Sequence, residues 1–198
     1  SNELISSQAS ASWKASRPAH ARLILNGAVG DDLVSNLARL PQVDGLGGFM
    51  QTSARWRLAP DADWKECVII AIEDYRDQRY DLISLVAGQW PGSKSIAVEF
   101  NHAAPYGVPE VGGTIYVEFG KRVEALTLNG TVRDPWQAPP PFVQSPAFYV
   151  TRDVMEHLTG SRDFNQLRFT VPHYGQAEVK AAATTVEAKL NRAGSGVA

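Results

Sequence analysis

The sequence predicts a mainly β, α+β fold, which we expect to be an antiparallel β-sandwich or an open barrel with two or three short helices. Apolar and polar residues alternate in many short segments, which is typical of strands. Turn residues separate these segments at intervals of roughly 8–15 residues. Strands do not alternate regularly with long helices, so a doubly wound parallel sheet is disfavoured.

Eight segments show strand patterning, of which 66–76 is the strongest. We expect it to form a hairpin with 79–88, and a helix over 73–86 is the competing interpretation. The segment 113–132 predicts two strands that meet at Gly120. The other expected strands are 21–27, 53–60, 94–100 and 165–172.

Three segments show helical spacing: 31–41, 153–159 and 176–194. Asp31 or Asp32 is the expected cap of the first, and Asp153 with Glu156 resembles a capping box at the start of the second. In the third, β-branched residues leave a strand over 176–187 as the alternative. The expected loops are 42–49, 101–113 and the proline-rich crossing 134–146.

The length of 198 residues is that of one domain. We expect a loose N-terminus over residues 1–12, a single β-rich domain over 13–192 and a disordered tail over 193–198. A chain of this size can bury a large core without disulfide bonds.

The single cysteine, Cys67, excludes an internal disulfide and lies in an apolar segment, where we expect a buried small hydrophobe. The sequence begins with Ser1 and Asn2, as a chain does after removal of a signal peptide. We therefore expect a periplasmic or secreted bacterial protein, with the cytoplasm as the alternative location.

Charge and motifs exclude several functions. The net charge is −2, which predicts no nucleic-acid partner, and the longest apolar run, Cys67 to Ile72, is too short for a membrane span. The segment 88–95 departs from the spacing of a phosphate-binding loop and leads into a strand. The four histidines lack the local spacing of a metal site. We expect no cofactor and no metal.

Exposed aromatic residues in proline-containing loops are the best candidates for partner binding. Trp90 and Trp136 both have proline neighbours, and Phe142 follows three consecutive prolines. Large amphipathic rings serve both in cores and at recognition surfaces. These three residues predict a site for a protein or envelope partner, and the alternative is that they cover the edge of a sheet.

The leading hypothesis is therefore an exported, non-enzymatic, β-rich domain that binds a partner. No catalytic residue is assigned, although folding could assemble a hydrolase or lyase site from His102 or His173 with Glu99 or Glu118. A third hypothesis is a subunit of a phage or secretion assembly. The oligomeric state is left open.

The stretch 123–192 has a distinctive order of segments. A strand (VEALTLNG) precedes a Pro-Phe crossing (PPPF), a short helix ending in HLTG, a strand (LRFTVPHYG) and a last segment ending in Lys-Leu. This order resembles the layout of the invasion-associated locus B proteins, a family of small exported β-sandwich proteins. Members of that family usually carry several cysteines, whereas this chain has one. The resemblance implies an exported β-rich domain and transfers no catalytic residue.

Overall fold

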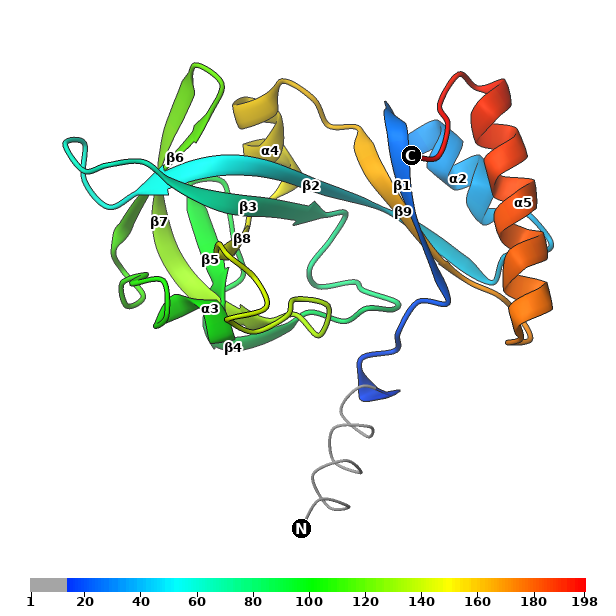
Figure 1. The fold of residues 1–198 in the computed structure, drawn as a ribbon, viewed down its shortest axis with the longest axis horizontal. Coiled ribbons are helices and arrows are strands. Elements are labelled where there is room, and N and C mark those ends of the chain that lie inside the picture. Colours follow the sequence, from blue (N-terminus) through cyan, green and yellow to red (C-terminus); the bar gives the residue numbers. More distant parts are fainter. Residues whose placement is uncertain (1–13) are drawn as a thin grey trace, which may run out of the picture.

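The computed structural model describes residues 14–198 and contains one nine-stranded sheet with helices at its margins (Figure 1). The strands are β1 (Ala21–Val29), β2 (Gly45–Arg57), β3 (Lys65–Ile72), β4 (Ser84–Gly88), β5 (Ser95–Glu99), β6 (Thr114–Phe119), β7 (Arg122–Arg133), β8 (Ala147–Tyr149) and β9 (Phe164–Thr170). The helices are α2 (Asp31–Ala38), α3 (Phe100–Ala103), α4 (Arg152–Thr159) and α5 (Gln176–Arg192). The α+β class is confirmed.

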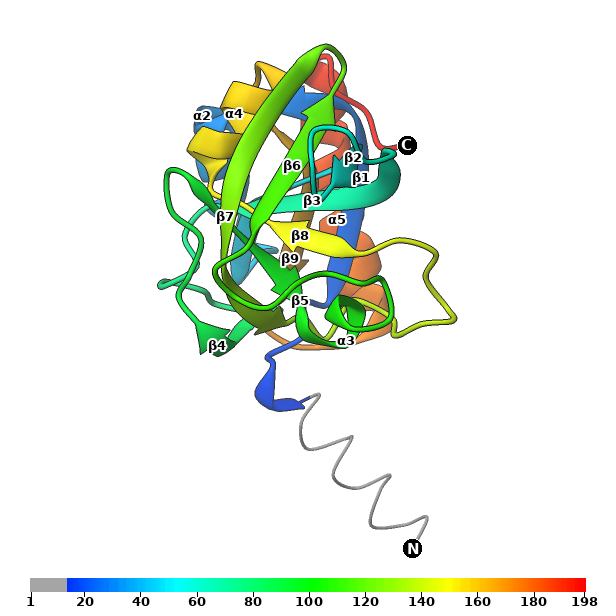
Figure 2. The same cartoon turned by 90° about the vertical axis from the view of Figure 1, so that its left-hand side faces the viewer.

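Six strands pair in a closed cycle, which we call the ring. The order is β2, β3, β8, β5, β7 and β6, and β6 pairs back with β2 (Figure 2). The β3–β8 and β5–β7 pairs are parallel, so the sheet is mixed. The prediction of a purely antiparallel sheet is therefore wrong. Strand β4 extends the sheet beyond β7 and ends it on that side.

The other strands form a second part, the βα lobe, which lies to the right of the ring in Figure 1. Strand β9 pairs antiparallel with β1 on one side and with the first residues of β2 on the other. Helices α2 and α5 lie beside these strands. Their apolar stripes are buried, and the buried residues are Val34 and Leu37 of α2 and Ala182, Val186 and Leu190 of α5.

Strand β2 belongs to both parts, because its beginning pairs with β9 and its end with β6. We predicted a loop over 42–49, and that prediction is wrong from Gly45 onward. Glycine suits this strand because the Phe164 ring packs directly against its backbone. A Cβ at Gly48 would lie 2.2 Å from that ring.

Both faces of β3 are buried, which explains its continuous apolar run. Ile69 and Ala71 join the large core, whereas Ile70 and Ile72 join a second core with Tyr75, Tyr80 and Ile83. The predicted hairpin between 66–76 and 79–88 is wrong, because β3 pairs with β2 and β8 while β4 pairs with β7. Residues 73–83 instead form a loop whose aromatic side chains pack into the second core.

The three predicted helices are present, and the N-caps of the first two differ from the predictions. The N-cap of α2 is Gly30, and the N-cap of α4 is Thr151, whose Oγ1 accepts a hydrogen bond from the Val154 amide. Asp153 is one residue inside α4, so the capping-box interpretation is wrong. Segment 176–192 is helical, so its strand alternative is wrong, and the short α3 lies where a loop was predicted.

The predicted disordered tail, 193–198, instead packs along β1. Val197 forms a β-bridge with Leu25, and the amides of Asn26 and Ala198 donate to the carbonyls of Gly196 and Ile24. Edge strands present unpaired backbone groups, and the tail satisfies part of them on β1. Residues 1–12, the predicted loose N-terminus, lie outside the described residues. Within 14–198, no helix is long and apolar enough to cross a bilayer.

Candidate functional site

One fully buried carboxylate, that of Asp81, joins the two parts of the molecule. Its side chain is 0% exposed and lies in the β3–β4 loop. It forms ion pairs at 3.3 Å with Arg22 of β1 and Arg168 of β9, and it accepts a hydrogen bond from the Ala19 amide at 2.8 Å. The indole Nε1 of Trp136 also donates to it. We call these four side chains, Asp81, Arg22, Arg168 and Trp136, the Asp81 cluster.

Trp136 is therefore part of the fold's framework. The Arg22 guanidinium lies 3.3 Å from the centre of its ring, and the Trp136 amide donates to Asp134 at 3.0 Å. Burial, and then the charge of Arg168, lower the pKa of Arg22 to about 10, which leaves it charged at neutral pH. The contact with Arg22 ties the start of the 134–146 loop to β1, whereas the bond to Asp134 is local to that loop.

The other two predicted partner-binding residues, Trp90 and Phe142, differ in how far their rings are exposed. Trp90 is half-buried and stacks on Tyr75, with ring centres 5.4 Å apart and planes at 20°. Phe142 is 81% exposed, more than any other large apolar side chain in the described chain. No ring–ring contact among the described residues joins two of the three predicted residues, so they do not form one cluster.

The loop that carries Phe142 is fixed at several points. His102 Nδ1 accepts from the Ala147 amide at 3.0 Å, and His102 Nε2 lies 2.9 Å from the Ala138 carbonyl. The Tyr106 hydroxyl donates to the carbonyl of Val143. An exposed aromatic ring on a loop held in this way loses little conformational entropy when it binds a partner.

The same contacts determine which ring nitrogen of His102 carries the proton. Because Nδ1 accepts a backbone amide proton, Nε2 carries the ring proton and donates it to Ala138. The ring is fully buried, and both nitrogens are used by the backbone. His102 is thus a structural histidine with no nitrogen available to a substrate, although Glu99 Oε2 lies 4.0 Å from Nε2.

The remaining residues of the hydrolase or lyase hypothesis are dispersed. Glu118 lies on β6 and is paired with Arg55 of β2. His173 is exposed between β9 and α5, in the βα lobe, whereas Glu99 and His102 lie at the end of β5 in the ring (Figure 1). These four residues do not assemble into one site.

Glu99 gives a prediction about the effect of pH on stability. Its side chain is 1% exposed, and Oε1 has no hydrogen-bond partner in the described chain. Burial raises its pKa above the usual 4.5, and the charge of Asp134 adds to this rise, whereas the hydrogen bond from the Asn101 amide opposes it. The folded state therefore binds the proton more tightly than the unfolded state does. The resulting stabilisation is complete below pH 4.5 and is lost as the pH rises through the folded-state pKa.

We therefore expect Glu99→Gln to gain stability relative to the wild type as the pH rises above 4.5. Urea unfolding at a series of pH values measures this difference. Glu110→Gln, at an exposed position, is the matched control and should show no such trend. A Glu99→Gln difference that is independent of pH would contradict the raised pKa.

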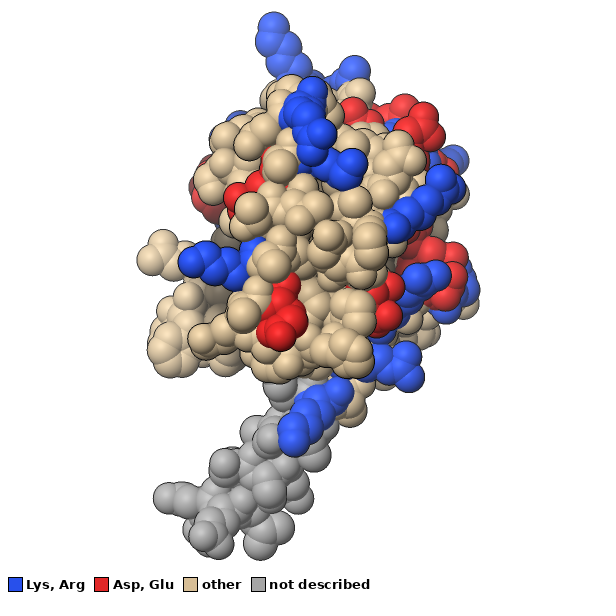
Figure 3. Space-filling view, turned by 90° about the vertical axis from the view of Figure 1, so that its right-hand side faces the viewer, with Lys and Arg blue, Asp and Glu red and all other residues tan. Residues whose placement is uncertain are grey.

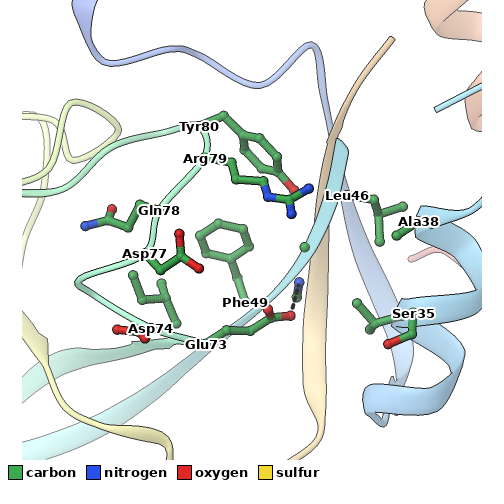
Figure 4. Close-up of a pocket in the computed structure, with 14 residues that line it drawn as sticks. Ser35, Ala38, Leu46, Phe49, Glu73, Asp74, Asp77, Gln78, Arg79 and Tyr80 are labelled. Carbon is green, nitrogen blue, oxygen red and sulfur yellow. Dashed lines mark hydrogen bonds between the residues drawn. The ribbon is translucent and has the colours of Figure 1, made fainter. Parts of the chain in front are cut away.

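A cleft of about 270 Å³ separates α2 from the β3–β4 loop, and we call it the acidic cleft (Figure 4). Glu73, Asp74 and Asp77 line it on the loop side, together with the cation Arg79. Glu73 Oε1 accepts from the Gly48 amide of β2 at 3.3 Å, which ties the loop to the strand. The cleft is small, and its mixture of carboxylates with an arginine is typical of a solvated surface and not of a pair of catalytic carboxylates.

Sequence reasoning missed three exposed apolar residues, one in α3 and two in β4. Phe100, the first residue of α3, is 45% exposed beneath the guanidinium of Arg133. Leu85 and Val86 are exposed on β4, because no further strand pairs with it in the described chain. The alternation of 79–88 indicated a strand, but nothing in the sequence indicated that it lies at the edge of the sheet.

Comparison with solved structures identifies the fold. The extracellular domain of the noncanonic ABC-type transporter YknZ from Gram-positive bacteria superposes with a TM-score of 0.59 at 10% identity. The match covers 90% of this chain and 100% of that domain. The periplasmic region of MacB from Actinobacillus actinomycetemcomitans matches with a TM-score of 0.55 at 13% identity, over 86% of this chain and 81% of that one.

A third solved structure matches with a similar TM-score and a similarly low identity. A domain of a putative permease protein from Porphyromonas gingivalis gives a TM-score of 0.52 at 13% identity, over 85% of this chain and 83% of that one. No protein-family model matches the sequence, and comparison with curated proteins finds no match. At these identities the likeness establishes a shared fold, which extracellular and periplasmic transporter domains also have.

Proposed function

We propose that this chain is an extracytoplasmic, non-enzymatic domain of an ABC-type transporter assembly and that it binds a protein partner. The observation that carries the proposal is the match to the YknZ extracellular domain over 90% of this chain and the whole of that domain. The match spans both the ring and the βα lobe, so it supports correspondence of the complete architecture. A periplasmic or secreted location follows from the proposal, and the cytoplasm is the alternative.

Phe142 is the residue we propose for contact with the partner. It is strongly exposed, and its loop is fixed by His102 and Tyr106. Trp136 holds the same loop from the inside through Asp81, so we assign it a positioning role. Trp90 stays a predicted contact residue, with part of its ring used against Tyr75.

Cysteine labelling in intact cells tests the extracytoplasmic location. Cys67 is 1% exposed, and burial, followed by the charge of Glu66, raises its pKa to about 12, so the native thiol is unreactive at neutral pH. We expect a membrane-impermeant maleimide to label a Lys121→Cys variant of the full-length protein in intact cells of the native host. Lys121 is exposed in the turn between β6 and β7.

The wild-type protein is the control for this experiment and should stay unlabelled. Labelling of Lys121→Cys only after the cells are lysed would place the domain in the cytoplasm and refute the proposed location. A positive result without lysis agrees with a transporter domain or a secreted protein, and fractionation of membranes separates these two cases.

Three further proposals concern the ring, the stretch 123–192 and the assembly to which the chain belongs. We infer that the ring acts as a small barrel, because its pairing is cyclic. The resemblance of 123–192 to the invasion-associated locus B proteins stays a prediction on which the structural comparisons do not bear. Assignment to a phage or secretion assembly also stays a prediction, and light scattering that reveals a stable homo-oligomer would support it.

A further inference from the structure

A second and larger cavity, of about 950 Å³, lies where the described chain begins, and we call it the basic cavity. Its walls come from residues 14–20, the end of the β3–β4 loop, the start of β2 and the segment that follows β9. Arg79 and Tyr80 line both this cavity and the acidic cleft. In Figure 3, Lys and Arg side chains lie at this lower end of the molecule.

The charged residues of the basic cavity are mostly cations. Lys14, Arg17 and Arg79 line it, and none of the three forms an ion pair within residues 14–198. Asp44 is the single carboxylate in the lining. Counted over its own lining, the cavity therefore has a surplus of two positive charges. The two arginines of the Asp81 cluster, in contrast, share one carboxylate.

The wall that carries Lys14 and Arg17 is anchored to the rest of the fold. The amides of Asp81 and Leu82 donate to the carbonyls of Arg17 and Ser16, both at 2.8 Å, and the Ala19 amide donates to Asp81. Arg17 has a φ of +49°, a backbone conformation that residues other than glycine rarely adopt. Such backbone strain persists only where surrounding contacts impose it, and it is concentrated at ligand-binding sites.

Aromatic rings and a further donor complete the lining. The His20 and Tyr174 rings are in contact, with centres 4.8 Å apart, and Tyr174 is 73% exposed. His20 Nδ1 accepts from the Val171 amide, so Nε2 carries the ring proton and is a hydrogen-bond donor. The cavity thus combines donors and positive charge with flat apolar surfaces on one side.

We propose that the basic cavity binds the phosphate group of an organic phosphate monoester. Such a group carries a charge of about −1.5 to −2 at pH 7, which matches the surplus of the cavity. Lys14, Arg17 and Arg79 contact the phosphate, and the organic part packs on Tyr80 and Tyr174. A volume of about 950 Å³ greatly exceeds what inorganic phosphate needs and suits a small organic ligand. These residues are distinct from Phe142, so the proposal does not rest on the transporter assignment.

Phosphate monoesters occur both as soluble metabolites and as the headgroup of phosphatidic acid in membranes. Isothermal titration calorimetry with phenyl phosphate tests the shared chemistry. We expect saturable binding that is at least tenfold weaker in the Arg17→Gln/Arg79→Gln variant. The Lys121→Gln/Arg192→Gln variant has the same change in charge at distant exposed positions, and it should bind as the wild type does. Inorganic phosphate should bind more weakly than phenyl phosphate.

Vesicles of phosphatidylcholine with and without phosphatidic acid identify the source of the ligand. Binding that needs phosphatidic acid and Arg79 supports a lipid headgroup, whereas binding of phenyl phosphate alone supports a soluble ester. The proposal is overturned if phenyl phosphate shows no saturable binding, if both double variants lose affinity equally, or if inorganic phosphate binds equally well. Lys14→Gln provides a second test, and it should also weaken the binding of phenyl phosphate. Thermal unfolding confirms that each variant is folded.

Discussion

Asp81→Asn is expected to lower the free energy of unfolding by about 3–5 kcal/mol, the cost of breaking a buried ion pair by removing one partner. The asparagine has nearly the same shape but no charge, and its amide nitrogen is a donor that faces other donors. Arg168, whose side chain is 5% exposed, would be left buried without its carboxylate. The loss arises at the contact between β1, β9 and the β3–β4 loop, so both parts of the molecule are affected.

Urea unfolding of the single and double variants measures this effect. Replacing Arg168 with Met in the Asp81→Asn background should recover part of the loss, because the uncompensated charge is removed. Asp153→Asn removes a carboxylate that is 72% exposed and should leave the unfolding midpoint unchanged. If Asp81→Asn and Asp153→Asn have the same effect, the Asp81 cluster does not stabilise the fold.

Trp136→Ala is expected to destabilise the protein by about 2–3 kcal/mol, which is less than the cost of deleting a fully buried tryptophan. The substitution removes the indole donor to Asp81 and the ring beneath Arg22. Phe142→Ala should change stability by less than about 0.5 kcal/mol, because its ring is 81% exposed. The two substitutions therefore separate a positioning residue from a contact residue.

Partner binding provides the second half of this test. Phe142→Ala should reduce capture of the partner from an envelope extract at unchanged thermal stability, whereas Trp136→Phe should retain both the ring under Arg22 and the capture. Val123→Ala, at an exposed position on β7, is the matched control. Undiminished capture by Phe142→Ala would remove Phe142 from the proposed interface. A large loss of stability in that variant would show that its loop covers the core.

Local patterns predicted the elements well and their partners poorly. Alternation around Gly120 predicted β6, β7 and the turn between them, and helical spacing predicted α5. The partner of 79–88 was wrong because alternation indicates that a segment is a strand without indicating which strand it pairs with. The glycines that begin β2 predict a loop, because the residues that they contact are far along the chain. The Phe164 ring lies against Gly48, and Tyr80 lies against Gly45 and Gly47.

The candidate site shows the same limit of local information. Proline neighbours correctly indicated that Phe142 lies in an exposed loop, but they gave the same indication for Trp136, whose carboxylate partner is 55 residues away in sequence. The charged residues of 73–81 surround the turn of the hairpin that was predicted between 66–76 and 79–88. The pattern does not distinguish the buried Asp81 from the exposed Asp77, because only the arginines of β1 and β9 make burial of that carboxylate favourable.

The C-terminal tail has a consequence for how these molecules can associate. The described sheet has two ends, β1 and β4, and the tail covers part of the first. We expect edge-to-edge association to use β4 more readily than β1, and removal of residues 193–198 to uncover the rest of the β1 edge.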